Sequence, residues 1–250
     1  MITVSVLGTG KVGTHFIKAF INHKDIKLLQ IYSRSAHSLH HYKGIKGTTQ
    51  STLELLKADI YIVALPDDVI PTLDLTHLKG LVVHTSGTVS YHAIKAKNRG
   101  VLYPAQSFTK EKEIELSKVP FCLETEFKKD DLLLENFTKL FSDRYQYLDE
   151  QKRQKLHLAA VFANNFSNRM IGIAHDICQK QAIDFELLQP LIQETFLKTQ
   201  IIAPNLAQTG PAIREDQHTI NKHLSLLSGL NKDIYEILTK SIQNQKHAEL

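Results

Sequence analysis

The sequence predicts an α/β fold in which a doubly wound parallel sheet is followed by an all-helical region. Two patterns support this prediction. In residues 1–149, short and nearly continuous apolar runs alternate with helical patterns, which is typical of strands buried on both faces of a parallel sheet. In residues 150–250, apolar side chains recur at helical spacing and no strand pattern is found. We therefore expect two domains, residues 1–149 and 150–250.

The apolar runs set the order of the predicted elements. Strands are expected at residues 2–7, 28–32, 60–65, 81–84, 100–103, 121–124 and 145–148, and helices at 12–22, 51–57, 91–97 and 130–141. One long helix is expected over residues 150–181, followed by helices at 185–202, 217–227 and 232–244. Pro204, the Gly210–Pro211 pair and Gly229 interrupt them. Helices this apolar need a covering surface, from the first half or from a second copy of the chain.

Composition excludes several classes of protein. No apolar run is long enough to cross a bilayer, and no basic leader precedes the first strand. The two cysteines, Cys122 and Cys178, are too far apart for a disulfide framework or a metal-spaced cluster, so we expect a reduced, cytoplasmic setting without a bound metal. Basic and acidic residues are interspersed, which argues against nucleic-acid binding. The net charge of +4 suits an anionic small-molecule ligand.

The first turn of the chain carries the pattern G-x-G-x-x-G between an apolar strand and a helix. In that context the pattern is typical of a Rossmann domain, where the helix N-terminus holds the pyrophosphate of a dinucleotide. Gly8 would permit the tight turn, Gly10 the approach of the pyrophosphate, and Gly13 the packing of helix on strand. A turn without a ligand is the alternative. The residues expected to bind cofactor are Gly8, Thr9, Gly10, Lys11, Val12 and Gly13.

The end of the second strand indicates which dinucleotide is bound. NAD-binding domains usually place a carboxylate there, about 20 residues beyond the glycine turn, on the ribose 2′-hydroxyl. Here the strand is followed by Ser33, Arg34 and Ser35, with no acidic residue. Arg34 can pair with a 2′-phosphate that a carboxylate would repel, and the serines can donate their hydroxyls. NADP is therefore the expected cofactor, and an exposed surface arginine is the alternative.

Two later strands end at the edge of the sheet where ligands of open parallel sheets bind. Leu65, Pro66 and Asp67 come at the end of one strand, and Ser86 and Gly87 follow the next. Pro66 would turn the chain beside the nicotinamide, and Ser86 and Gly87 would leave room for its ring. Ordinary loop chemistry is the alternative, because Pro, Asp, Ser and Gly favour turns in any case.

These N-terminal motifs together resemble the NADP-linked group that contains pyrroline-5-carboxylate reductases and deazaflavin-dependent NADP oxidoreductases. Residues 103–108 (YPAQSF) and 209–216 (TGPAIRED) are similar to an uncharacterised bacterial family that joins a Rossmann-like domain to a helical domain of unknown function. The resemblance extends over essentially the whole chain. It implies a C-terminal domain like that of 6-phosphogluconate dehydrogenase, used for homodimerisation, and no established reaction. Tyr103, where many relatives have a histidine, and Glu215, where a glycine is usual, depart from it.

The long helix offers the best-placed polar groups for chemistry. Adjacent asparagines inside an apolar helix need hydrogen-bond partners, which cofactor, substrate or a loop of the first half could supply. A structural role is an equal alternative. One predicted stripe of the helix contains His157, Val161, Asn164 and Asn168, and the adjacent stripe contains Asn165 and Arg169.

Proton transfer and substrate binding have several further candidates. The related β-hydroxyacid dehydrogenases use a lysine one turn before a helix asparagine, but Ala160 and Val161 stand at those positions here. Arg214 could grip a substrate carboxylate, with an ion pair between domains or subunits as the alternative. For His84, at a strand end, capping of a loop is the alternative role. The remaining proton-transfer candidates are Tyr103, His157, His218 and His223.

Three functions stay open at this point. The first is an NADP-dependent oxidoreductase that acts on a small anionic or imine-containing metabolite. The second is an NADP-binding sensor or scaffold without turnover, since Rossmann domains also bind without catalysis. The third is a nucleotide-sugar or mononucleotide enzyme that uses the same glycine turn, which would show no preference for the 2′-phosphate.

Overall fold

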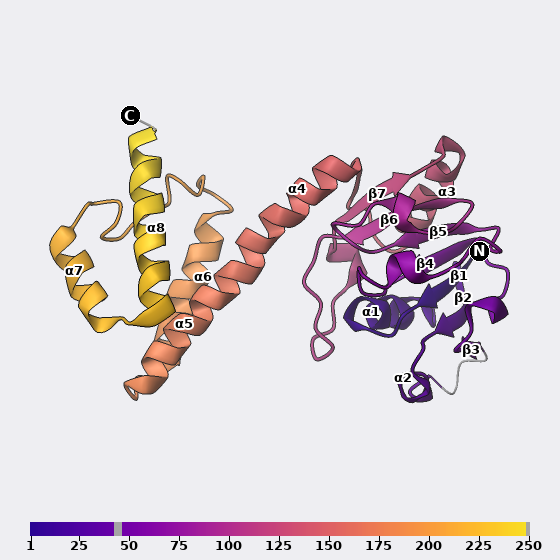
Figure 1. Cartoon of the computed structure of the whole chain (residues 1–250), viewed down its shortest axis with the longest axis horizontal. Helices are drawn as coiled ribbons and strands as arrows, with labels where there is room; N and C mark the ends of the chain where they lie inside the picture. Colours follow the sequence, from indigo (N-terminus) through magenta and orange to yellow (C-terminus); the bar gives the residue numbers. More distant parts are fainter. Residues whose placement is uncertain (43–46, 249–250) are drawn as a thin grey trace. The chain divides into compact units, whose positions relative to one another are not determined.

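The computed structural model describes residues 1–42 and 47–248 (Figure 1). The chain divides into two compact units, Met1–Asn165 and Phe166–Leu250. This division falls inside the long helix that was expected over residues 150–181. The sequence predicted a domain boundary between residues 149 and 150, and the long helix begins at that position. The roles expected for the two predicted domains stay predictions.

An eight-stranded sheet forms the framework of the first unit, in the order β3-β2-β1-β4-β5-β6-β7-β8. Neighbouring strands run parallel, except that β6 and β7 are antiparallel. This strand order confirms the predicted Rossmann-type fold. The short β3 was not predicted. The strands are β1 (Ile2–Leu7), β2 (Ile26–Tyr32), β3 (Thr48–Thr49), β4 (Ile60–Val63), β5 (Leu81–His84), β6 (Arg99–Pro104), β7 (Phe121–Thr125) and β8 (Tyr145–Tyr147).

One face of this sheet is covered by helices. The helix α1 (Lys11–Phe20) buries Phe16 and Phe20, and α3 (Lys128–Lys139) buries Phe137, in a single apolar cluster with the strands (Figure 1). The rings of Phe20 and Phe137 meet edge-on at 5.6 Å. Both helices were predicted within two residues. A short helix that was not predicted, α2 (Ala36–His40), adds Leu39 to the same cluster.

The other face is covered by 3₁₀ turns, so two predicted helices are wrong. Residues 51–57 and 91–97 form only the short turns Thr52–Glu54 and Tyr91–Ala93. Each turn ends because the next residue, Leu55 or Ile94, becomes extended and enters the core of this face. A continued helix would carry these apolar side chains away from the sheet.

The helix α4 (Glu150–Ala160) begins where the sheet ends. Asp149 caps it, because its side chain accepts a hydrogen bond of 2.8 Å from the Lys152 amide. A π-helical segment, Val161–Phe166, follows directly and continues into α5 (Ser167–Lys180). The single long helix predicted over these residues is therefore confirmed, with a change of helical type that periodicity did not indicate.

The second unit consists of helices and turns, as predicted. Its described part contains no strand. The sequence predicted that Gly229 interrupts the helices. In the structure α8 begins at Gly229, so the interruption lies immediately before this residue. No helix in the described part of the chain is long and apolar enough to span a membrane. Beyond α5 the unit comprises the 3₁₀ turn Phe185–Leu188, α6 (Gln189–Lys198), α7 (Gln217–Leu226) and α8 (Gly229–Ala248).

Candidate functional site

The glycine turn has the geometry that a dinucleotide requires. Gly8 is buried with φ of +116°, and a Cβ there would collide with the Ala64 carbonyl at the end of β4. A Cβ on Gly13 would collide with the Gly8 carbonyl, so α1 contacts the turn without a side chain between them. By contrast, a Cβ on Gly10 would meet no heavy atom within 4 Å. Two glycines are thus required by close packing, and the third leaves open space above the turn.

The beginning of α1 faces that open space. Gly10 is the N-cap of the helix and supplies no side chain to cap it. The first amides of a helix lack partners within the helix and carry the positive end of its dipole. Lys11 is exposed beside them, whereas Thr9 and Val12 are half-buried. These residues therefore fit a bound pyrophosphate.

The end of β2 is tied to the glycine turn by hydroxyl groups. The Thr9 hydroxyl donates to Ser33 Oγ at 3.3 Å, and the Ser35 amide donates to the same oxygen at 3.3 Å. Arg34 is exposed, and its guanidinium has no hydrogen-bond or ion-pair partner among the described residues. A positive group is thus available beside the glycine turn, and the end of β2 carries no carboxylate.

The ends of β4 and β5 are linked to each other. The Thr88 hydroxyl donates to the Asp67 carboxylate at 2.8 Å, so the loop after β5 contacts the loop after β4. Ser86 is buried, and its Oγ accepts from the amides of Thr88 and Val89 at 3.1 Å each. Leu65 packs close to Gly8, and Pro66 is exposed. The predicted cofactor residues of these two loops therefore lie at one edge of the sheet.

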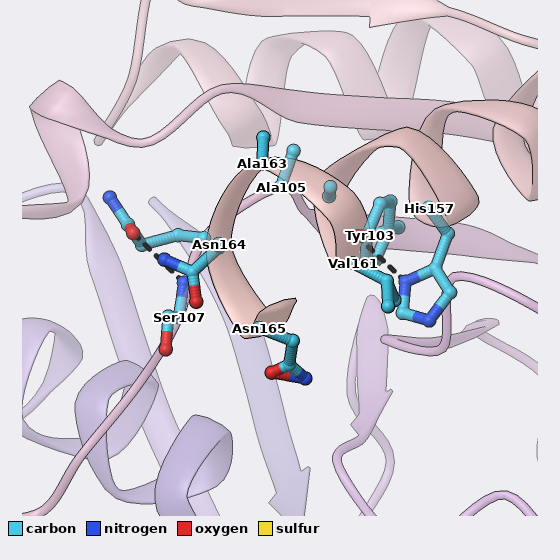
Figure 2. Close-up of a pocket in the computed structure, with 10 residues that line it drawn as sticks. Tyr103, Ala105, Ser107, His157, Val161, Ala163, Asn164 and Asn165 are labelled. Carbon is cyan, nitrogen blue, oxygen red and sulfur yellow. Dashed lines mark hydrogen bonds between the residues drawn. The ribbon is translucent and has the colours of Figure 1, made fainter. Parts of the chain in front are cut away.

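A pocket of about 260 Å³ lies at the carboxyl end of β6, within the first unit. Figure 2 shows Tyr103 and His157 together at one end of this pocket, and Ser107 and Asn164 at the other. Its wall contains no acidic or basic side chain other than the imidazole. The lining residues are Tyr103, Ala105, Gln106 and Ser107 from β6 and the loop after it, and His157, Ala160, Val161, Ala163, Asn164 and Asn165 from α4 and the π segment.

Tyr103 and His157 form a hydrogen-bonded pair in this pocket. The Tyr103 hydroxyl lies 3.1 Å from His157 Nδ1, and the two rings meet edge-on at 5.8 Å (Figure 2). Burial raises the pKa of Tyr103, and the nearby Cys122 thiol raises it further, so the phenol keeps its proton near neutral pH. Two of the predicted catalytic candidates, 54 residues apart, are therefore in direct contact.

Gly87 packs against this pair. A Cβ on Gly87 would lie 2.6 Å from His157 Nδ1, well inside contact distance. The sequence suggested that Gly87 leaves room for the nicotinamide ring. In the structure, the space beside Gly87 is filled by the imidazole of His157.

The π segment explains why two consecutive asparagines line the pocket. Its turn is wider than an α turn, so successive side chains rotate less around the axis, and π segments are frequent at functional sites. Asn164 and Asn165 both line the pocket and are both exposed to solvent. Their side chains point in different directions (Figure 2). Because both side chains are exposed, they do not require buried partners within the chain, and their contact with cofactor or substrate stays a prediction.

The other candidates are not among the residues that line this pocket. Arg214 is exposed in the second unit, in the turn before α7. His223 Nδ1 bonds to the Tyr235 hydroxyl at 2.8 Å, and His218 is exposed. His84 is buried, and its Nδ1 accepts from the Ser86 amide at 3.1 Å, as expected for a loop cap. Among residues 1–42 and 47–248, no group of three potential metal ligands is found.

Sequence reasoning missed one residue next to the pocket. Arg153 is completely buried, four residues before His157, in a stretch of α4 whose other polar residues are largely exposed. An arginine one helical turn before a candidate catalytic histidine lies on the same helix face, and this spacing is the signal that could have found it.

Comparison with known proteins places the chain in a family. It matches a crystal structure from Bacteroides fragilis described as a "putative NADP oxidoreductase", with 32% identity, coverage of 97% of this chain and 98% of that one, and a TM-score of 0.87. The chain belongs to the same family of Rossmann-like oxidoreductases. Residues 119–242 match a domain of unknown function, DUF2520. The comparison with curated protein sequences gives no match.

More distant structures share the fold of this family. A 1-pyrroline-5-carboxylate reductase from Streptococcus pyogenes is 15% identical, with 98% of each chain covered and a TM-score of 0.62. An imine reductase variant from Myxococcus stipitatus, solved with NAD⁺, is 17% identical, with coverage of 99% of this chain and 94% of that one and a TM-score of 0.62. The predicted resemblance to an NADP-linked reductase group is confirmed at the level of fold.

Proposed function

We propose that this protein is an NADP-dependent oxidoreductase that transfers a hydride between the nicotinamide and a small metabolite with a carbon–nitrogen or carbon–oxygen double bond. The observation that carries the proposal is the Tyr103–His157 pair in a pocket at the same sheet edge as the glycine turn. The family and the imine reductase and pyrroline-5-carboxylate reductase folds support the same class of reaction.

The chain's own residues fit the cofactor. The amides at the beginning of α1 would hold the pyrophosphate in the open space above Gly10. Arg34 would pair with the 2′-phosphate, and Ser33 and Ser35 would border the ribose. The loops after β4 and β5, with Leu65, Pro66, Asp67 and Ser86, would border the nicotinamide half, whereas Gly87 contacts the imidazole of His157. When bound, the nicotinamide supplies or accepts the hydride.

The pair in the pocket supplies the proton. In the reductive direction, Tyr103 passes its hydroxyl proton to the substrate nitrogen or oxygen, and His157 returns a proton from Nδ1 to the resulting phenolate. The imidazole, which is half-buried, takes up a replacement proton from solvent. The amides of Asn164 and Asn165 and the Ser107 hydroxyl can orient the substrate. In the oxidative direction the same two residues take the proton in reverse order.

The pocket also constrains the substrate. Its volume of about 260 Å³ suits a small molecule, and apart from the imidazole its wall is uncharged. We therefore place the reacting imine or carbonyl group in this pocket. Arg214, which is exposed in the second unit, stays a candidate from the sequence for binding an anionic ligand.

NADPH oxidation with a panel of imines, aldehydes and oxo-acids tests the catalytic proposal. Tyr103→Phe keeps the ring and removes the proton, so turnover should fall by roughly 10²- to 10⁴-fold while NADPH affinity is unchanged. Tyr235→Phe, which removes a hydroxyl from the second unit, is the matched control. NADPH binding without turnover of any compound would instead favour the sensor function.

Calorimetry with both nicotinamide cofactors tests the preference for NADP. Arg34→Ala should weaken NADPH binding by about 10- to 100-fold and leave NADH binding unchanged, because only the charge-assisted contact with the 2′-phosphate is lost. Lys18→Ala removes another exposed positive charge, on the far end of α1, and should change neither affinity. Equal losses for both cofactors would contradict the role of Arg34.

We also propose that the second unit pairs with a second copy of the chain. Of its described residues, only Cys178, Ala212, Ile220 and Thr239 are buried. Many large apolar side chains left exposed in one unit indicate an interaction surface. Light scattering should give twice the mass of one chain. Among the described residues of the second unit, the exposed large apolar side chains are Phe166, Ile177, Ile183, Leu187, Leu191, Phe196, Leu197, Ile201, Ile202, Leu206, Leu226, Leu230, Ile237 and Leu238.

A further inference from the structure

Arg153 is the largest fully buried side chain of the protein's described part. Its Nη1 donates to two carbonyls of the loop after β5, to Ser86 at 3.2 Å and to Val89 at 2.9 Å. Its Nη2 donates to Glu124 Oε2 on β7 at 3.1 Å. One guanidinium on α4 therefore holds both a loop and a strand of the sheet.

Glu124 completes this arrangement from the other side. Its second oxygen, Oε1, accepts from the Glu150 amide at 3.0 Å, so one carboxylate contacts α4 at its first residue and again at Arg153. Gln154 adds a hydrogen bond of 2.9 Å to the Thr88 carbonyl. The first turns of α4 are thus fixed to the loop over Ser86 to Val89.

The held loop contains the glycine that contacts His157. Gly87 lies between the two carbonyls that Arg153 binds, and the imidazole of His157 packs directly on it. His157 is also one helical turn beyond Arg153. The Arg153 guanidinium therefore binds the loop backbone that contacts the imidazole, and Arg153 lies in the same helix as His157.

Stability alone gives a weak reason for this arrangement. A buried ion pair often contributes no more than apolar side chains of the same volume, because both charges lose their hydration. Arg153 Nε, moreover, has no hydrogen-bond partner among the described residues. The forked geometry of the guanidinium is what a lysine or an apolar residue would lack.

We propose that Arg153 is a positioning residue: through the loop over Gly87 it holds the imidazole of His157 in line with the Tyr103 hydroxyl. This inference rests on the proposed role of the Tyr103–His157 pair. If this inference holds, replacing the Arg153 guanidinium changes the orientation of the His157 imidazole relative to the Tyr103 hydroxyl, even where the fold and the cofactor site are intact.

The nitrogen-15 NMR signal of His157 Nδ1 tests the proposal without any substrate. A His157→Gln variant assigns the signal. In Arg153→Lys, which keeps the charge and loses the fork, the signal should move from its hydrogen-bonded position to that of a free imidazole. Turnover should fall about 100-fold, the loss expected for a displacement of about 1 Å, with NADPH affinity unchanged. Lys155→Met, an exposed position on the same helix, should change none of these.

Gly87→Ala provides a second route that leaves Arg153 intact. The added Cβ pushes the imidazole away directly, so this variant should reproduce the change of the Nδ1 signal. An unchanged signal in either Gly87→Ala or a folded Arg153→Lys overturns the proposal, and so does Arg153→Lys with normal turnover and only a lower melting temperature. If the wild-type protein oxidises no NADPH, the proposed function fails, while the Nδ1 signal still decides whether Arg153 positions His157.

Discussion

The two units of this chain differ in how far their apolar side chains are buried. The first unit buries them in two large clusters, one on each face of the sheet. The second unit buries four of the residues that the structure describes and leaves many large apolar side chains exposed, Ile201 to 86%. A unit of 85 residues with so little core does not reach the burial that independent domains require. This difference is the reason for the proposed pairing of the second unit with a second copy of the chain.

Deletion of core side chains gives the largest expected effect on this comparison. Phe16→Ala should reduce the free energy of unfolding by about 3–5 kcal/mol, because a fully buried ring leaves a cavity. Leu53, which is 80% exposed in the first unit, is the control, and Leu53→Ala should change it by about 0.5 kcal/mol or less. Urea denaturation measures both.

The same experiment at Leu191 sharpens the comparison. This residue of α6 is 63% exposed in one chain. If a second copy covers it, Leu191→Ala should cost about 2–3 kcal/mol, and the loss should depend on protein concentration. A loss as small as that of Leu53→Ala at every concentration would contradict the homodimer.

Acid stability gives a smaller effect that belongs to the first unit alone. Burial lowers the pKa of His84 to about 4 from 6.5, and the Arg153 charge contributes. Between these values the unfolded chain binds a proton that the folded chain excludes, so stability decreases as the pH falls through this window. Between pH 7 and pH 5 this group should account for about 2 kcal/mol.

The variant His84→Asn isolates that contribution. Its amide oxygen can still accept from the Ser86 amide, but the side chain does not titrate. The wild-type protein should lose about 2 kcal/mol more than the variant on going from pH 7 to pH 5. Parallel stability curves for the two proteins over this range would show that the folded chain does not exclude a proton from His84.

The framework of the first unit could be predicted because its signals are local. The glycine turn between a strand and a helix, and the apolar runs of β1, β4 and β5, each lie within ten residues. The 3₁₀ turns at Thr52–Glu54 and Tyr91–Ala93 could not, because Leu55 and Ile94 leave the helical path only to reach a core made by distant strands. Tertiary packing here overrides local periodicity.

The candidate site was predictable as a set of residues but not as an arrangement. Tyr103 and His157 were each plausible alone, yet their contact depends on the β6 end and α4 meeting across 54 residues. Arg153 lies in a polar stretch of sequence that predicts exposure to solvent. Its burial is explained by its contacts with Glu124 and the loop after β5. The π segment has no sequence period of its own. Pairwise contacts of this kind need the folded chain.

The smallest predicted effect is the loss of stability on removing the cap of α4, and it should leave the position of His157 unchanged. Asp149→Ala removes the cap from the helix and should lower the free energy of unfolding by about 1 kcal/mol. The Nδ1 signal of His157 should not move, because Glu124 still binds the Glu150 amide and Arg153 still holds the next turn. A moved signal would mean that the cap, and not the guanidinium, sets the position of the imidazole. Lys152→Ala, which keeps the backbone amide that Asp149 accepts from, is the matched control and should change neither quantity measurably.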